Sequence, residues 1–237
     1  MEFNSDIKMT GSLSIKQYDV DGQLIGDLFV PNLVVTAGKE YIANRMTSNN
    51  MSPMSYMAIG QSTTASAATQ TTLLTEAQRA VISATTINGT AITYSSTFTT
   101  FASTIAMTEA GIFNQSASKA VTFDGNLGIS GGIITTMSPS LHTFATTNEV
   151  RYSNGGGSSV GGLVDGNIYY IIAASTTSVK LATSAANATA GTFITLTAGS
   201  GTAHKLTFGT MLCRTTFPVV SKSTTDTIVI SWTVTVG

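Results

Sequence analysis

The C-terminal segment of this chain alternates between apolar and mostly hydroxylated side chains. From Thr227 to Val236, every second residue is Ile, Trp or Val, and most of the residues between them are Thr or Ser. Ile92–Phe101 has a similar alternation, with Ile92, Tyr94 and Phe98 on one side. A period of two is typical of antiparallel strands with one buried face. We therefore expect a predominantly β fold, with Trp232 in its core and not on a sugar-binding surface.

Composition indicates a surface of hydroxyl groups with few ions. Of 237 residues, 42% are hydrophobic and 10% are charged, and the net charge is -1. Ordinary soluble domains carry about 25% charged residues. Because isolated proteins are usually kept apart by charge, we expect neighbouring molecules to cover much of this surface. The basic residues are scattered, which argues against nucleic-acid binding.

Local signals predict a hairpin followed by a helix. The segments 13–18 and 24–30 flank Asp19-Val-Asp-Gly22, whose Asp-Gly pair favours a tight turn over a calcium loop. Thr36 is a good N-cap for a helix over 37–46. Ile42, Ala43 and Met46 would form the apolar stripe of that helix.

The middle of the chain reads as a domain inserted into another. We expect strands at Val150–Ser153, Ile168–Ala173, Val179–Ala182, Phe193–Thr197 and His204–Thr207, separated by glycine-rich turns. Removing this stretch would leave the strands 105–113 and 211–219 as a plain antiparallel hairpin. The predicted fold is all-β: an antiparallel, jelly-roll-like β-sandwich with one short helix (1–114 and 209–237), carrying a small β-sandwich or barrel domain (115–208).

Residues suited to catalysis or metal binding do not cluster in the sequence. His142, His204 and Cys213 are too dispersed for a zinc site, and Cys213 is expected to be a buried, inert thiol. The glycine-rich run 155–162 lacks the ending of a phosphate loop. We predict no catalytic residue, no metal site and no cofactor.

Three acidic motifs leave alternatives open. Asp124-Gly-Asn126 and Asp165-Gly-Asn167 are either turns or calcium-binding loops. Glu76 and Arg79 would share a face in a helical turn and lie on opposite faces in a strand, and a structural ion pair is the favoured reading over a catalytic pair.

The sequence shows no signal-peptide pattern in its first residues and no apolar stretch of membrane-spanning length. The first residues lack the basic region and apolar run of a signal peptide. The longest apolar stretch, Ile168–Ala174, is too short to cross a bilayer. We expect a protein made in the cytosol that stays soluble, without membrane insertion.

Several motifs resemble a family of tailed-bacteriophage virion proteins that are described as tail fibre, tail collar or minor structural proteins. The resemblance covers residues 10–114 and 209–237. It rests on Asn32–Lys39 (Asn-Leu-Val-Val-Thr-Ala-Gly-Lys), Met57–Gly60, Leu73–Arg79, Glu109–Asn114, Met211–Phe217 and Ile230–Val234. Val150–Gly157 and Gly161–Tyr170 resemble a module found inside varied phage surface proteins.

This resemblance implies a non-enzymatic structural protein of the virion, made in the host cytoplasm. It would assemble symmetrically with its own copies and with other virion proteins, first as a tail or collar fibre and second as a capsid decoration protein. A glycan-binding adhesion module is a further alternative, with Tyr152, Tyr169 and Tyr170 of the insert as candidate contacts. An enzyme that degrades surface polysaccharide is a third reading.

Overall fold

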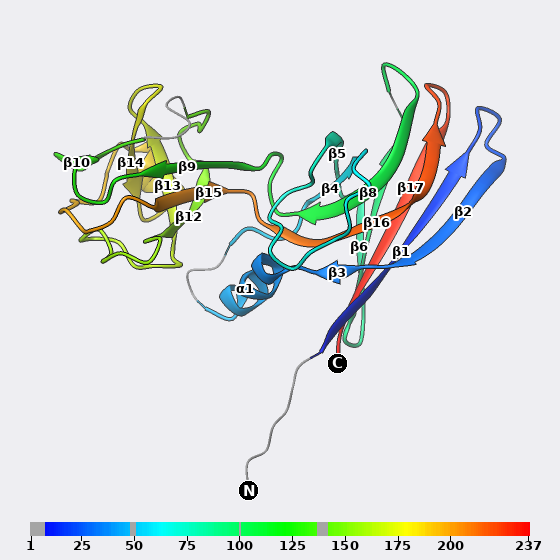
Figure 1. The fold of residues 1–237 in the computed structure, drawn as a ribbon, viewed down its shortest axis with the longest axis horizontal. Coiled ribbons are helices and arrows are strands. Elements are labelled where there is room, and N and C mark those ends of the chain that lie inside the picture. The colour runs from blue at the N-terminus through cyan, green and yellow to red at the C-terminus, as the bar shows by residue number, and fades with distance from the viewer. Residues whose placement is uncertain (1–7, 48–50, 100, 137–141) are drawn as a thin grey trace, which may run out of the picture. The chain divides into compact units, whose positions relative to one another are not determined.

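The computed structural model describes residues 8–47, 51–99, 101–136 and 142–237 (Figure 1). Its backbone divides into two compact units. Unit 1 contains residues 1–43, 53–116 and 210–237, and unit 2 contains residues 44–52 and 117–209. From the sequence we placed the two domain boundaries after residues 114 and 208. In the structure they lie after residues 116 and 209. The assignment of residues 44–52 to unit 2 had no sequence signal.

Unit 1 is an antiparallel β-sandwich, as the alternation predicted. Its first sheet, sheet A, has five strands in the order β2 (Leu24–Pro31), β1 (Met9–Tyr18), β17 (Thr227–Val236), β7 (Ala91–Phe98) and β6 (Ala84–Asn88). Its second sheet, sheet B, has the order β3 (Leu33–Val34), β16 (Met211–Lys222), β8 (Ile105–Phe113), β4 (Tyr56–Gly60) and β5 (Glu76–Val81). The β1–β2 hairpin, the β7 alternation and the β17 alternation are all confirmed.

The core of unit 1 lies where the alternating positions point inward. Ile228, Ile230 and Trp232 are fully buried on β17, and Leu13 and Ile15 are buried beside them on β1. Trp232 is therefore a core residue, as expected. In sheet B, β4 is buried at four of its five positions and β8 is buried from Met107 to Phe113, so these central strands show no alternation of buried and exposed residues.

The predicted helix is present as α1 (Thr36–Arg45), but its predicted apolar stripe is wrong. Met46 is 87% exposed, and the buried positions are Gly38 and Tyr41. A Cβ on Gly38 would lie 2.0 Å from the carbonyl oxygen of Leu212, so the helix backbone packs directly on β16. The buried face of α1 is therefore the one that carries Gly38, because the missing side chain lets the helix approach β16 closely, and not the one predicted from hydropathy.

The hairpin that carries unit 2 is formed as predicted. β8 pairs antiparallel with β16, with Phe113 opposite Met211. Just beyond them, the amide N–H of Asn114 donates to the carbonyl of Thr210 at 3.2 Å. The Asn114 side-chain oxygen accepts from the Thr210 N–H at 2.6 Å. This clasp keeps the two ends of the intervening segment side by side.

Unit 2 is built on one antiparallel sheet of seven strands. Their order is β10 (Ile129–Ser130), β11 (Ile133–Thr135), β14 (Ser178–Ala182), β13 (Ile168–Ala173), β12 (Glu149–Ser153), β15 (His204–Phe208) and β9 (Lys119–Phe123). Four predicted strands are confirmed. Phe193–Thr197 is not a strand: only Thr197 makes an isolated bridge, to Gly161. A short helix, α2 (Ala185–Thr189), was not predicted.

Neither helix in the described part of the chain is long and apolar enough to span a membrane.

Candidate functional site

The three tyrosines proposed as glycan contacts have different environments within unit 2. Tyr152 is fully buried, and its hydroxyl accepts from the N–H of Val160 at 3.0 Å and lies 2.8 Å from Nδ1 of His204. Tyr169 is 6% exposed, and its hydroxyl accepts from the N–H of Val164. Stacking on a sugar needs an exposed ring, so the prediction is wrong for Tyr152 and Tyr169.

Tyr170 is half-buried, on the face of the sheet opposite to Tyr152 and Tyr169. Burial raises the pKa of its hydroxyl, and the nearby Glu149 carboxylate raises it further. The same burial raises the pKa of Tyr152. A glycan contact at Tyr170 stays a prediction.

The two histidines occupy structural positions in unit 2. His204 is fully buried, with Nε2 3.0 Å from the carbonyl of Ser200. His142 is 7% exposed, with Nε2 3.1 Å from the carbonyl of Ser178. Within the ranges that the structure describes, no three His, Cys, Asp or Glu side chains converge as a metal site requires. Cys213 is buried, which raises its thiol pKa, as the sequence suggested.

The Asp19 and Asp124 motifs form turns held by their own carboxylates, whereas the Asp165 carboxylate accepts from the N–H of Asn154 at 2.7 Å. Asp19 Oδ1 accepts from the N–H groups of Asp21 and Gln23, at 3.0 and 2.8 Å. Asp124 Oδ1 accepts from the N–H groups of Asn126 and Leu127, both at 2.8 Å. These are the Asx contacts expected of turns.

Glu76 and Arg79 form an ion pair even though they lie in a strand, which the simple strand reading excluded. Their closest N–O distance is 2.6 Å. In the β4–β5 register, Gly60 is opposite Glu76 and Ile59 is opposite Gln78, so Ala77 is an extra residue. This bulge turns the two side chains to the same face.

Sequence reasoning missed a buried ion pair beneath the long loop of unit 1. Glu109 and Arg214 are both fully buried, and their side chains meet at 2.7 Å. Glu109 also accepts backbone N–H groups from Ser62, Leu74 and Thr75. Arg214 donates to the carbonyl of Thr64 and to the side chain of Gln70. Together they fasten the loop 61–75 onto sheet B, so this pair organises structure.

A second buried charge closes the turn between β16 and β17. The Lys222 ammonium is fully buried and donates to the carbonyls of Thr99, Ser223 and Asp226. Burial lowers its pKa. The Asp226 carboxylate accepts from the N–H of Ser223 at 3.1 Å and from Gln17 Nε2 at 2.7 Å. Hydrogen bonds with Ser223, followed by the one from Gln17, lower the pKa of Asp226.

We expect Asp226→Asn to reduce the stability of unit 1 in a pH-dependent way. The pKa of Asp226 is lower in the folded state than in the unfolded state, where it is about 3.9. Its contribution is therefore complete above about pH 4 and is lost as pH falls through the folded pKa. Calorimetry should show Tm lowered by about 2–4 °C at pH 7, with the difference from wild type shrinking below about pH 4. A difference that grows on acidification would contradict this.

The outer face of sheet A is a lattice of hydroxyl groups, which we call the hydroxyl face. The register sets Ser12 opposite Thr233, Thr233 opposite Thr93, and Thr93 opposite Thr86 across four strands. None of these residues is buried. Thr10, Ser14, Ser95, Thr97, Thr227, Ser231 and Thr235 lie on the same face. The charged residues of this face, Lys16 and Asp27, are opposite each other in the register.

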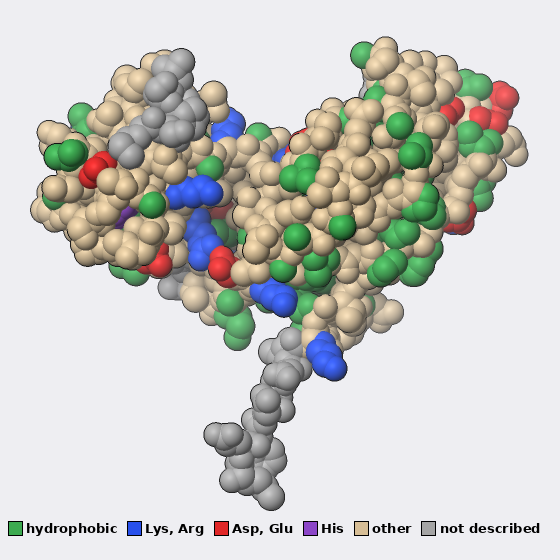
Figure 2. All heavy atoms as spheres, in the orientation of Figure 1, with side chains coloured by type: hydrophobic (Ala, Val, Ile, Leu, Met, Phe, Trp, Pro, Cys, Tyr) green, Lys and Arg blue, Asp and Glu red, His purple; other side chains and the backbone are tan. Residues whose placement is uncertain are grey.

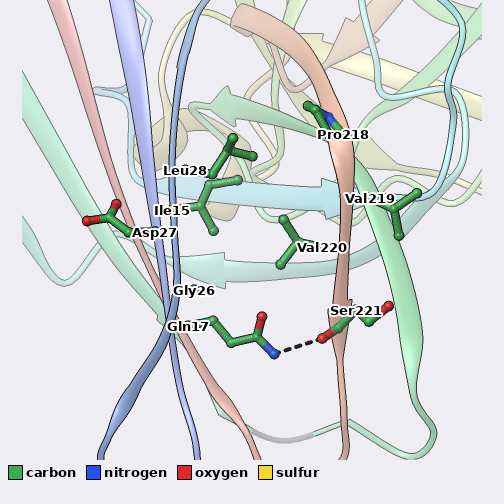
Figure 3. Close-up of a pocket in the computed structure, with 9 residues that line it drawn as sticks. All are labelled: Ile15, Gln17, Gly26, Asp27, Leu28, Pro218, Val219, Val220 and Ser221. Carbon is green, nitrogen blue, oxygen red and sulfur yellow. Dashed lines mark hydrogen bonds between the residues drawn. The ribbon is translucent and has the colours of Figure 1, made fainter.

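A groove of about 410 Å³ opens at one side of the sandwich in unit 1 (Figure 3). Ile15 and Leu28 point into it from sheet A, and Val220 points toward them from β16, whereas Asp27 and Val219 point away. The groove exists because the two sheets separate here. Between Thr216 and Val220, β16 is out of register with β8, which marks a bulge around Pro218.

Two polar contacts bound this groove. Near one end, Thr215 Oγ1 donates to the carbonyl of Pro31 at 2.7 Å. At the other end, Gln17 Nε2 donates to the carbonyl of Ser221 at 2.7 Å (Figure 3). Its lining combines the apolar side chains of Ile15, Leu28 and Val220 with polar groups of Gln17 and Ser221, and the Asp27 carboxylate faces away. The groove is suited to receiving apolar side chains.

Comparisons with protein-family models, curated protein sequences and solved structures found no match for this chain.

Proposed function

We propose that this chain is a structural protein of a tailed-bacteriophage particle, of tail- or collar-fibre type, which assembles through contacts between its own copies and with other virion proteins. The observation that carries the proposal is the hydroxyl face of sheet A. It is a wide strand surface whose side chains are suited to lying against another protein surface.

The chemistry of the hydroxyl face supports permanent coverage. Covering an ion requires its dehydration, which costs several kcal/mol unless a partner compensates. Hydroxyl groups cost less, particularly where they already pair with each other. Thr93 and Thr233 are 2.8 Å apart, and Ser95 and Ser231 are 3.2 Å apart. Depletion of charge is also the compositional mark of interface cores.

The phage-like motifs support the same proposal, because they occur in elements that build unit 1. They contribute to β3 and α1, β4, β5, β8, β16 and β17. Unit 2 interrupts this set through the β8–β16 hairpin, whose clasped ends allow a separate domain to be carried. A tail or collar position is the first expectation, and capsid decoration is the alternative.

Fractionated particles provide the test. We expect the chain to copurify with density-gradient-purified phage in several copies per particle, by quantitative mass spectrometry. Gold-labelled antibody against unit 2 should then mark either the tail or the head. A chain present in the lysate but absent from purified particles would overturn the proposal.

The hydroxyl face can be tested in the same assay. Thr233→Lys places a charge at its centre and should reduce incorporation into particles at least tenfold, because the ammonium must be dehydrated on assembly. Leu127→Lys is the matched control, since Leu127 is 86% exposed in unit 2. Equal incorporation of both variants would argue against this face as the assembly surface.

A further inference from the structure

Two unpaired strand edges border the groove of unit 1. β2 is the last strand of sheet A and pairs only with β1. β16 pairs with β3 only at Cys213 and Arg214, so no described strand lies along its remaining residues on that side. Free N–H and C=O groups on such edges are ready to pair with an added strand.

The direction of the free backbone groups on β2 follows from one hydrogen bond. The N–H of Asn32 donates to the carbonyl of Gly11 on β1 at 3.1 Å. Because bonding direction alternates along a strand, the N–H and C=O groups of Asp27 and Phe29 point away from β1. Pro31 has the same orientation, so its lack of an N–H group removes no hydrogen bond between β2 and β1.

The side chains along this edge are unusually apolar for exposed positions. Ile25 is 54% exposed, Phe29 is 71% exposed, and Val219 on the facing strand is 59% exposed. Figure 2 shows apolar side chains gathered on the β1–β2 side of unit 1. A small apolar ligand would fill the groove but leave the backbone groups of β2 unpaired. An added strand satisfies both.

We propose that β2 pairs antiparallel with β2 of a second copy of this chain, across a two-fold axis, with Leu28 opposite Leu28. A two-fold interface needs one surface that is complementary to itself. β2 meets this condition, because it offers both a free backbone ladder and apolar side chains on both faces. Leu28 and Val30 of the second copy then extend the groove-facing side of sheet A and cover the groove.

Charge favours this register. Asp27 then lies opposite Phe29 of the second copy, and both residues use their free N–H and C=O groups. A shift that sets Asp27 opposite Asp27 would bring two carboxylates together on one face.

The size of the edge predicts a weak to moderate dimer. Eight residues of β2 span about 27 Å. One strand pair with the flanking groove is near the lower end of specific interfaces, which bury about 600–800 Å² per partner. We therefore expect dimerisation that depends on concentration in the micromolar range.

Disulfide trapping tests the register. In a Leu28→Cys variant of the full chain, the two thiols face each other at a pair without backbone hydrogen bonds, about 4.5 Å apart between Cα atoms. We expect a covalent dimer under mild oxidation, at least tenfold more abundant than from Ile87→Cys. Ile87 is 71% exposed on β6, the opposite edge of sheet A. Equal yields from both variants would overturn the proposal.

Sedimentation supplies a measurement that does not depend on a cysteine. Phe29→Asp sets a second carboxylate opposite Asp27 of the other copy and should weaken dimerisation at least tenfold, and Ile87→Asp should leave it within twofold of wild type. A wild-type chain that stays monomeric at several hundred micromolar would overturn the proposal. If Asp27→Asn strengthens the dimer tenfold or more, the carboxylates oppose each other and the proposed register is wrong.

This inference deepens the proposed function, since it rests on assembly of the chain with its own copies, but the two fail separately. A chain that is found in particles and is monomeric in solution overturns the β2 pairing and leaves the virion proposal. A chain that dimerises through β2 and is absent from particles overturns the virion proposal and leaves the β2 pairing.

Discussion

Replacing Arg214 by Met is expected to lower the free energy of unfolding of unit 1 by about 3–5 kcal/mol, the usual cost of leaving one partner of a buried ion pair alone. Arg214 and Glu109 are both fully buried and meet at 2.7 Å. Methionine fills part of the volume but donates no hydrogen bond. The Glu109 carboxylate would keep only its backbone N–H donors in a site without water access.

Urea denaturation followed by circular dichroism measures this loss. Lys39→Met is the control, because Lys39 is exposed on α1 and surface substitutions usually change stability by less than about 0.5 kcal/mol. Combining Arg214→Met with Glu109→Gln removes the uncompensated charge and should recover at least about 1 kcal/mol. A loss below about 1 kcal/mol in the single variant would show that the pair is not buried as described.

The same substitution should also release the loop 61–75. Arg214 donates to Thr64 and Gln70, and Glu109 accepts from Ser62, so the pair is the main anchor of this loop. Hydrogen exchange of the loop amides should accelerate in Arg214→Met beyond what global unfolding explains. In Lys39→Met these amides should exchange as in wild type.

Replacing Lys222 by Met is expected to cost about 2–3 kcal/mol, which is less than the loss at Arg214. The ammonium donates to three carbonyl oxygens, of Thr99, Ser223 and Asp226, and lies 4.6 Å from the centre of the Phe101 ring. Hydrogen bonds to a charged group contribute about 1.5–3 kcal/mol each. Relief from burying the ammonium offsets part of the loss of three such bonds.

The measurement for Lys222→Met is again urea denaturation, with Lys16→Met as the control. Lys16 is exposed on β1 of sheet A, so its replacement removes a charge without leaving buried carbonyl groups unpaired. We expect the β16–β17 turn to exchange its amides faster in Lys222→Met only. Equal stability of both variants would contradict a structural role for the buried ammonium.

Strands with one buried face were predictable because their period is written in the sequence. The predicted strand Thr227–Val236 has the same bounds as β17. The antiparallel pairing of residues 105–113 with residues 211–219 was predicted by removing the inserted domain, and β8 and β16 pair in this way. The central strands β4 and β8 of sheet B are buried at successive residues, so they carry no alternation and their order stayed hidden. Phe193–Thr197 shows the converse error: it contributes the buried Leu196 to the core of unit 2 but joins no sheet beyond the isolated bridge of Thr197.

The candidate sites depended on burial, which a sequence does not report. Tyr152 and Tyr169 looked like surface aromatics, yet neighbouring backbone N–H groups hold their hydroxyls inside unit 2. Glu109 and Arg214 are 105 residues apart, and no local pattern links them. The groove exists only because a bulge in β16 separates it from β2, two strands that come from opposite ends of the chain.

By itself the sequence determined the β class, the alternating faces of sheet A, the tight turns and the interruption of one domain by another, because each is encoded in local periodicity, turn chemistry or composition. Only the tertiary structure decided which charges are buried, which tyrosines reach the surface and which strand edges remain open. These depend on contacts between residues far apart in the chain, where packing geometry outweighs local preference.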